Sequence, residues 1–282
     1  MKYVIITPAK NEEKLIKFIL SSVVNQTIRP SKWIIVDDNS NDKTYEIVKD
    51  YARDYDWIKI TKCSINNKRA EGAPIIKAFY VGYELIKNDD WDFIVKLDAD
   101  LTLPKDYFET VINCFRQNND VGMAGGYCET IVNGIMKREH NATYHIRGPM
   151  KSIRRECWED IGGFKAVLGW DGLDEMMAMY HNWKTKNIDK KVIHHRPTTS
   201  DYDQRSHAYL EGYSKYKNGS NVTLIILRAL RRLSKKPRII YSLYFLSGYF
   251  KAMMNKESKN VTPELEKFIN KFHLERIKNL DF

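Results

Sequence analysis

Two aspartates, Asp98 and Asp100, stand two residues apart in the stretch LDADLTLP, directly after an apolar run. Both carboxylates can face one ligand if the strand formed by that run breaks into a turn, which Pro104 favours. Carboxylate oxygens are hard ligands that suit Mg²⁺ or Mn²⁺, and a diphosphate can complete the shell of such an ion. We therefore predict that Asp98 and Asp100 hold a metal ion that neutralises a departing nucleotide diphosphate. An acidic pair by itself is also common in turns without a metal.

Short apolar segments alternate with amphipathic segments through the first 104 residues. Four segments have the length and composition of buried strands: residues 3–7, 33–36, 57–63 and 93–97. The helices predicted between them cover residues 11–25, with Asn11 as the cap, 43–55 and 74–87. This alternation predicts an α/β domain with a mostly parallel sheet flanked by helices. Ligands of such sheets bind beyond the carboxyl ends of the strands, where Asp37, Asp38, Asp98 and Asp100 all stand.

The alternation is looser from residue 105 onward. Helices are predicted at residues 107–117 and 174–182, and strands at 122–132, 153–155 and 191–194. No GxGxxG follows the first predicted strand, and no GxxxxGK[ST] occurs anywhere. The sequence therefore lacks both the dinucleotide fingerprint and the P-loop.

The composition indicates a globular chain with an acidic partner. Of 282 residues, 43% are hydrophobic and 29% are charged, which is enough to bury a full core. The net charge is +10, and residues 205–282 contain 16 Lys and Arg against 6 Asp and Glu. The basic excess therefore lies in the last quarter, which favours contact with an anionic surface. The four cysteines have no metal-binding spacing, and we expect them to be reduced and buried.

Five motifs occur in a characteristic order: TPAKN at 7–11, VDDNSNDKT at 36–44, LDADLTLP at 97–104, GGF at 162–164 and GWDGLDE at 169–175. In this order the chain resembles the inverting, nucleotide-sugar-dependent glycosyltransferases of family 2, over roughly residues 1–200. The resemblance implies a GT-A fold, with residues 1–104 as the nucleotide-sugar-binding half and 105–200 as the acceptor half. One departure is Lys10, which stands where the family usually has an aromatic residue.

The resemblance also implies a set of nucleotide-binding residues: Thr7, Pro8, Ala9, Asn11, Asp38, Arg69, Gly72, Asp98 and Ala99. The backbone around Pro8 and the carboxylate of Asp38 would hold the base, and Arg69 would face the diphosphate. A carboxylate can accept a hydrogen bond from an imide N–H, which uracil offers and cytosine lacks. A UDP-sugar is therefore the favoured donor. Helix capping is the alternative role for Asp37 and Asp38.

Inverting transfer needs a base that deprotonates the acceptor hydroxyl, and a carboxylate is sufficient. In the family this is an aspartate at the start of the helix after GGF. Asp171 and Asp174 both fit, and on a helix they lie one turn apart. Related enzymes also place a histidine near the last strand as a metal or diphosphate contact. Of the adjacent His194 and His195, we predict His195 as the third metal ligand.

Residues 201–282 are predicted to form a basic, amphipathic helical tail. The two apolar stretches within 221–254 are divided by Lys and Arg, and neither is long enough to span a membrane. Such helices favour the surface of an anionic membrane, while a packed helical pair or a dimer contact are the alternatives. No nucleic acid partner is expected, because the basic residues alternate with bulky aliphatic ones. Residues 1–7 favour a strand over a signal peptide, so we expect a cytoplasmic protein, peripheral on the inner face of the membrane.

The sequence thus predicts a transferase that moves a sugar from a nucleotide diphosphate sugar to a hydroxyl acceptor, with a lipid-linked or cell-surface glycan as one acceptor class. Two other classes stay open. A nucleotidyltransferase shares the layout and acidic ligands, but TPAKNEEKL lacks the glycine-rich loop expected there. A catalytically inactive, membrane-associated module would keep the fold without needing Asp98 and Asp100.

Overall fold

The computed structural model describes residues 1–63, 74–132, 134–139, 142–196, 203–233 and 238–279. These residues form two compact units. Among the described residues, the first unit comprises 1–63, 74–164 and 181–196, and the second comprises 165–180, 203–233 and 238–279. The division differs from the predicted boundary at residue 200 because residues 165–180 group with the C-terminal helices.

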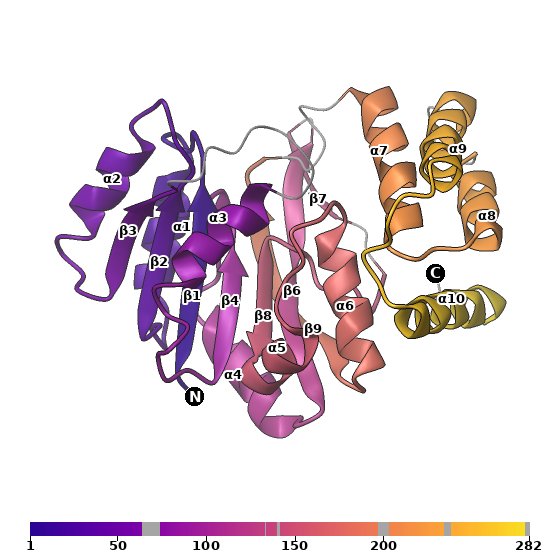
Figure 1. The fold of residues 1–282 in the computed structure, drawn as a ribbon. Coiled ribbons are helices and arrows are strands. Elements are labelled where there is room, and N and C mark those ends of the chain that lie inside the picture. Colours follow the sequence, from indigo (N-terminus) through magenta and orange to yellow (C-terminus); the bar gives the residue numbers. More distant parts are fainter. Residues whose placement is uncertain (64–73, 133, 140–141, 197–202, 234–237, 280–282) are drawn as a thin grey trace. The chain divides into compact units, whose positions relative to one another are not determined.

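The first unit is built on one nine-stranded sheet (Figure 1). Its strands are β1 (Tyr3–Ala9), β2 (Lys32–Asp37), β3 (Ile58–Lys62), β4 (Phe93–Leu97), β5 (Leu101–Thr102), β6 (Val121–Val132), β7 (Ile135–Arg138), β8 (Met150–Arg154) and β9 (Lys184–His194). They lie in the order β3-β2-β1-β4-β8-β6-β9-β5, and β7 pairs with β6. The first four strands are parallel, and β8 then runs antiparallel to both β4 and β6. The α/β class is confirmed, with a sheet that is parallel in its first half and mixed in its second.

Helices cover both faces of the parallel half. The helices of this unit are α1 (Ile16–Val24), α2 (Thr44–Tyr51), α3 (Pro74–Tyr83), α4 (Tyr107–Gln117) and α5 (Arg155–Ile161). One face of the sheet buries Ile5 and Trp33 in a core shared with α1 and α4. On the other face α3 approaches so closely that a Cβ on Gly82 would lie 2.7 Å from the side chain of Ile6. Burial on both faces explains why β1, β2 and β4 are largely apolar, whereas β3 (IKITK), at the edge of the sheet, alternates and is only partly buried.

The strand pairing brings three distant segments to one edge of the sheet. Ala9 at the end of β1 pairs with Asp37 at the end of β2. The Asp98–Asp100 turn joins β4 to β5, and Leu101 of β5 pairs with His194 of β9. The acidic turn therefore lies beyond the carboxyl ends of the parallel strands, as expected for a ligand site in such a sheet.

Four predicted elements begin elsewhere than expected: the helix predicted at 174–182 begins at Trp170, the strand predicted at 153–155 begins at Met150, and the first helix and last strand also differ. The first helix begins at Ile16 rather than near Asn11, because Asn11 adopts a left-handed backbone with φ of 55° and binds the loop after β2 instead of capping a helix. The last strand begins at Lys184 rather than at residue 191. All four cysteines are free and buried, as predicted.

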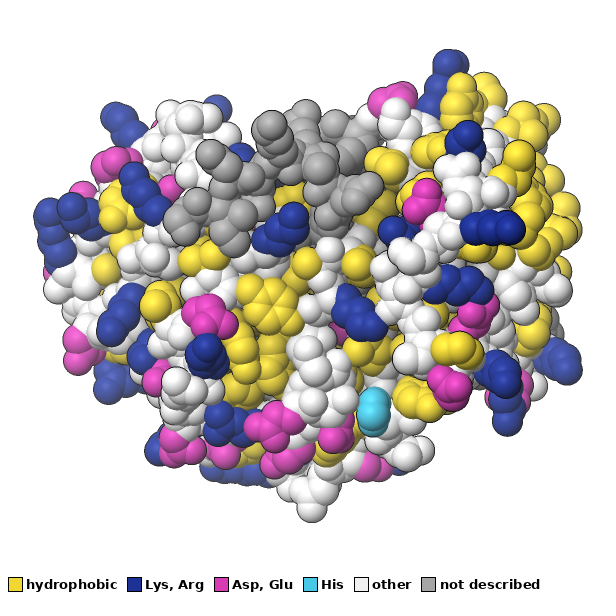
Figure 2. Space-filling view, viewed as in Figure 1, with side chains coloured by type: hydrophobic (Ala, Val, Ile, Leu, Met, Phe, Trp, Pro, Cys, Tyr) yellow, Lys and Arg dark blue, Asp and Glu magenta, His cyan; other side chains and the backbone are white. Residues whose placement is uncertain are grey.

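The second unit consists of helices, and it provides the predicted helical extension. Its helices are α6 (Trp170–Tyr180), α7 (Gln204–Lys217), α8 (Val222–Arg232), α9 (Arg238–Met254) and α10 (Pro263–Lys278). Helices α7 and α9 cross at two glycines, since a Cβ on Gly212 would lie 1.8 Å from the carbonyl oxygen of Phe245. Figure 2 shows hydrophobic side chains gathered over α8 and α9. Within the described ranges, no helix has the length and apolar character needed to cross a membrane.

Candidate functional site

The Asp98–Asp100 turn is held by its own strand and by the neighbouring one. The backbone N–H of Asp98 donates to the carbonyl of Pro149 at 2.7 Å, and its carboxylate pairs with Lys96. Lys96 is only 2% exposed, so the ammonium group is committed to this contact and to others inside the protein. Burial raises the pKa of Asp98, and the charge of Lys96 opposes that rise. The turn is therefore rigid, with one carboxylate already facing a cation.

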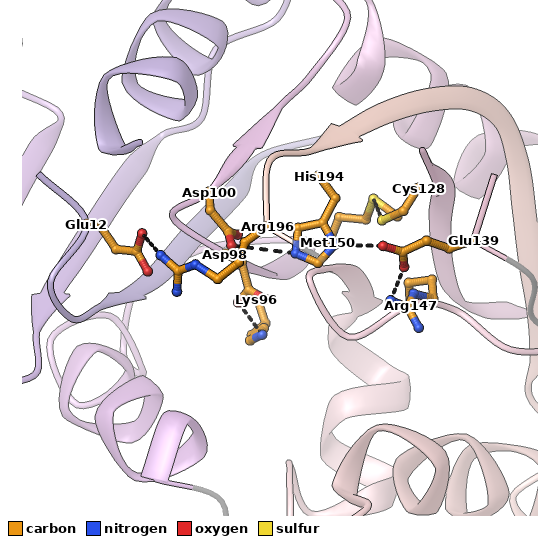
Figure 3. Close-up of polar contacts among 10 residues, drawn as sticks. All are labelled: Glu12, Lys96, Asp98, Asp100, Cys128, Glu139, Arg147, Met150, His194 and Arg196. Atoms are coloured by element: carbon orange, nitrogen blue, oxygen red, sulfur yellow. Dashed lines mark hydrogen bonds and ion pairs between the residues drawn. The ribbon is translucent and has the colours of Figure 1, made fainter. Parts of the chain in front are cut away.

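Asp100 faces a second cation, the imidazole of His194 on β9. The Nε2 atom of His194 lies 3.6 Å from a carboxylate oxygen of Asp100. Its Nδ1 atom lies 2.9 Å from Glu139, which in turn pairs with Arg147 (Figure 3). Burial alone would lower the pKa of His194, but the hydrogen bonds to Asp100 and Glu139 raise it to about 9. Asp100 has a lowered pKa despite its burial, because His194 and Arg196 favour the ionised form.

A further ion pair lies on the side of β1. Glu12, which follows β1, accepts a hydrogen bond from Arg196 at 2.6 Å. Burial raises the pKa of Glu12 to about 7, against the opposing effect of Arg196. Charges of opposite sign thus alternate along a set that we call the alternating network: Glu12, Arg196, Asp100, His194, Glu139 and Arg147 (Figure 3).

The residues expected at the nucleobase lie at the ends of β1 and β2. The backbone N–H of Asp38 donates to the carbonyl of Ala9 at 2.8 Å, so the two predicted contacts are adjacent. Lys10 lies 3.5 Å from the carboxylate of Asp38. The hydroxyl of Thr7 accepts a hydrogen bond from the buried Trp33, so the side chain of Thr7 belongs to the core.

Asn11 ties the two loops of this region together. Its backbone N–H donates to Ser40 at 2.9 Å, and its side-chain oxygen accepts from the N–H of Asn41 at 2.8 Å. Asn11 therefore shapes the loop that carries Asp38. The predicted Arg69 and Gly72 fall outside the described residues.

The two histidines face different surroundings. The ring of His195 bonds to the hydroxyl of Thr102 at 2.8 Å and stacks on Phe18, with ring centroids 4.2 Å apart. Successive side chains of a strand point to opposite faces, so only one of the pair can meet Asp100. The structure brings His194, and not the predicted His195, to that carboxylate.

The two candidate bases lie on α6 in the second unit. Asp174 is 2% exposed and accepts a hydrogen bond from the N–H of Glu175 at 2.7 Å. Asp171 is half-buried in the first turn of the helix. Their assignment as alternative bases stays a prediction.

Two groups of side chains have the chemistry of metal ligands. Cys128, Glu139 and His194 offer atoms within 4.8 Å of one another. Burial raises the pKa of the Cys128 thiol to about 12, and Glu139 is already paired with Arg147. That group therefore fits a structural role better. Asp98 and Asp100, with the imidazole of His194 beside them, offer the oxygen-rich set that Mg²⁺ or Mn²⁺ prefers.

Sequence reasoning missed most of the alternating network. Glu12 follows the TPAKN motif and Arg196 follows His194 and His195, so their charge and position could have indicated a role at the site. Glu139 and Arg147 belong to no predicted element or motif; Glu139 follows β7, which pairs with β6 beside β9, and Arg147 pairs with Glu139.

Residues 4–169, more than half of the chain, match the family described as Glycosyl transferase family 2. The chain belongs to this family. It is similar to the beta-monoglucosyldiacylglycerol synthase of Synechocystis sp., with 24% identity over 233 residues that cover 74% of this chain and 47% of the relative. The chain spans about half the length of the curated relatives it matches first.

Two solved structures share its fold. S. aureus TarS 1–349 in complex with UDP-GlcNAc superposes with a TM-score of 0.59 at 19% identity, covering 95% of this chain and 78% of that one. The mannosyltransferase PcManGT of Pyrobaculum calidifontis, solved with GDP-Man and Mn²⁺, gives 0.55 at 14% identity, covering 98% and 80%. These similarities confirm the predicted GT-A fold of this family 2 chain.

Proposed function

We propose that the protein is an inverting glycosyltransferase that moves a sugar from a UDP-sugar to a hydroxyl acceptor. The observation that carries the proposal is the buried Asp98–Asp100 turn, placed beyond the parallel strands of a family 2 chain. The backbone N–H of Asp98 is hydrogen-bonded and its carboxylate is paired with Lys96, so the turn is already positioned to bind a ligand.

For the donor, we favour uridine as the base. Asp38 is held against Ala9 at the edge of the sheet, where its carboxylate can accept the imide N–H of uracil. Lys10 lies near that carboxylate, so a cation stands where the family usually has an aromatic ring. TarS, a neighbour in fold, was solved with UDP-GlcNAc, which supports a UDP-sugar here.

For the metal, we propose Mg²⁺ or Mn²⁺ held by Asp98 and Asp100. The histidine that fits as a third ligand is His194, because its ring and not that of His195 lies at Asp100. A bound divalent ion would supply positive charge to the departing diphosphate. The fold neighbour PcManGT was solved with Mn²⁺, which supports the choice of ion.

The transfer itself needs a base from this chain. Asp171 or Asp174 would accept the proton of the acceptor hydroxyl while its oxygen attacks the anomeric carbon. The bond from that carbon to the diphosphate breaks on the opposite face, so the configuration inverts. Nearby Arg196 could add a donor to the leaving diphosphate, at the expense of its bond to Glu12.

For the acceptor and location, we propose a lipid-linked or cell-surface glycan assembled on the cytoplasmic side of the membrane. The name of the Synechocystis relative, a glucosyldiacylglycerol synthase, supports a lipid acceptor for part of this family. The basic excess of the C-terminal quarter supports an anionic partner as well.

A donor screen tests the proposal. Purified protein is incubated with individual UDP-sugars and Mn²⁺, UDP release is measured, and the configuration of the released or transferred sugar is determined by NMR. We expect slow release of UDP and β-configured sugar from an α-linked donor, and loss of both in Asp100→Asn. Release of pyrophosphate from a nucleoside triphosphate would instead assign a nucleotidyltransferase, and no turnover with any donor would favour an inactive module.

A further inference from the structure

Helices α8 and α9 expose a set of large apolar side chains. Among them are Leu230 of α8, exposed to 57%, and Ile239 and Leu243 of α9, exposed to 65% and 59%. The set, which we call the α8–α9 face, consists of Ile226, Leu230, Leu233, Ile239, Ile240 and Leu243. Ile226, Leu230 and the C-cap Leu233 are spaced by four and three residues, and Leu243 follows Ile239 and Ile240 by four and three, so they form stripes rather than scattered sites. Monomeric soluble proteins rarely leave such stripes exposed without a function.

Among the described residues, the core cluster of this unit does not include the side chains of the face. A separate set of side chains on the same helices forms the core of the unit, including Ile225, Tyr241 and Phe245. The crossing of α7 and α9 through Gly212 and Gly248 fixes α9 against the backbone of α7. The α8–α9 face is therefore presented on a scaffold that is already packed, and changing its residues should not remove core contacts.

The surroundings of the face are strongly basic. Residues 221–254 contain seven Lys and Arg and no Asp or Glu. Arg231 is exposed at the end of α8, and Arg232 lies over the ring of Tyr241 at 4.0 Å from its centroid. Figure 2 shows Lys and Arg side chains beside the hydrophobic ones in this region. An apolar stripe with Lys and Arg side chains beside it is the pattern of helices that lie in a membrane interface.

We propose that the α8–α9 face docks on the surface of an anionic lipid bilayer, with its apolar side chains among the acyl chains and its cations at the headgroups. This goes beyond the proposed transferase function and does not depend on it. Neither helix is long and apolar enough to cross the bilayer, so both lie in the interface. Each Lys or Arg near an anionic surface adds favourable energy, and Arg231 and Arg232 are exposed at the end of α8.

Charge also argues against a second copy of this chain as the occupant. A two-fold dimer would bring the same patch of both copies together. Residues 221–254 supply no acidic side chain to pair with seven cations from the partner, so such an interface would set like charges against each other. An anionic bilayer has the complementary sign.

Vesicle flotation tests the proposal. The full chain is floated with vesicles of phosphatidylcholine and phosphatidylglycerol, and separately with phosphatidylcholine alone. We expect binding to the anionic vesicles, at least tenfold weaker binding to the neutral ones, and a decline as NaCl rises above about 0.1 M, where the Debye length is about 10 Å.

Matched variants separate the face from general surface effects. Ile239→Glu/Leu243→Glu should reduce anionic vesicle binding more than tenfold, because it places two charges in the apolar stripe. Leu85→Glu/Ile135→Glu makes the same change at exposed residues of the first unit and should leave binding unchanged. Arg231→Glu should weaken binding several-fold, whereas Lys49→Glu, an exposed residue of α2, should not.

Metal-dependent UDP binding is measured on the same samples as a check on folding. Absence of vesicle binding at low salt by protein that still binds UDP, or still gives a native unfolding transition, would overturn the proposal. Equal binding of the Ile239→Glu/Leu243→Glu variant would also overturn it. A concentration-dependent dimer that this variant dissociates, without vesicle binding, would assign the face to a second copy. Failure of UDP binding with intact vesicle binding would count against the transferase function alone.

Discussion

The alternating network of the first unit and the segment that carries the α8–α9 face in the second differ in the signs of their charges. In the network, Asp100 and His194 are neighbours of opposite charge, and Glu12 and Arg196 repeat the pattern beside them. In residues 221–254, seven cations have no acidic side chain within the same segment. The first region therefore places charges of both signs side by side, while this segment of the second region supplies positive charge alone.

This difference indicates where each kind of ligand would act. A divalent ion and a diphosphate bring charges of both signs, and a site of alternating charge can offer carboxylates to one and a guanidinium to the other. A membrane surface brings only negative charge over a wide area, which matches a broad basic and apolar face. Variants in one region should therefore leave the function of the other intact.

Asp100→Asn should affect the most steps, since it weakens both metal-dependent donor binding and turnover. Removing one carboxylate weakens the charge stabilisation of the leaving diphosphate, so turnover should fall at least about a hundredfold. Steady-state UDP release from the best donor measures this, and Asp54→Asn, an exposed carboxylate in the same unit, is the control. Turnover within twofold of wild type would break the assignment of the acidic turn, while vesicle binding should be unchanged in either variant.

The next prediction distinguishes the two candidate bases, Asp171 and Asp174. Loss of a general base lowers the rate of transfer about 10²–10⁴-fold without weakening donor binding. We therefore expect one of Asp171→Asn and Asp174→Asn to lose transfer to an acceptor while its affinity for UDP stays near that of wild type. Full activity in both variants would show that the base lies elsewhere.

Substitution of His194 and of His195 tests which histidine belongs to the proposed metal site. His194→Gln should lower the affinity for Mn²⁺ about 10–100-fold, because its ring lies at Asp100. His195→Gln should have a smaller effect, since its ring contacts Thr102 and Phe18. Titration with Mn²⁺ in the presence of UDP measures both, and a larger loss in His195→Gln would favour the original prediction of His195 as the ligand.

The smallest predicted effect is a change in the pH dependence of stability, caused by His273 in the second unit. Burial, with the charges of Arg228, Lys215 and Arg276, lowers the pKa of His273 to about 3 from the ordinary 6.5. The unfolded chain therefore binds this proton more readily than the folded one, so the stability gained is present above pH 6.5 and lost as the pH falls toward 3. His273→Gln should reduce the decline of Tm on acidification.

Thermal unfolding followed by circular dichroism between about pH 7 and pH 4 covers most of this range. The exposed His181→Gln in the first unit is the control and should follow wild type. Parallel pH profiles for wild type and His273→Gln would contradict the buried, neutral state of His273.

Local sequence was enough to predict the acidic turn. The strand at 93–97 is a short apolar run, and the aspartates directly after it can only fall at its carboxyl end. The strand–helix alternation predicted the α/β class, because it leaves few arrangements of a parallel sheet. The GT-A fold was implied by the resemblance to family 2 that the order of the motifs carries. The C-terminal helices were predictable from their amphipathic pattern and their charge.

Long-range pairing determined what sequence could not predict. His194 reaches Asp100 because β9 extends from Lys184 and pairs with β5, a contact nearly a hundred residues away along the chain. Glu139 reaches His194 through the hairpin of β6 and β7. Asn11 was predicted as a helix cap, but its backbone is left-handed and its side chain binds the loop after β2. In each case the outcome depends on a partner strand or loop that no local pattern identifies.

Calorimetric titration with UDP, with and without Mn²⁺, tests the central claim most directly, with GDP and CDP as controls. The account predicts binding of UDP that requires Mn²⁺, exceeds that of GDP and CDP, and is lost in Asp98→Asn/Asp100→Asn while vesicle binding persists. Preferential binding of GDP would contradict the role given to Asp38. Binding of no nucleotide by folded protein, or binding unaffected by loss of both aspartates, would contradict the assignment of the acidic turn as the donor site.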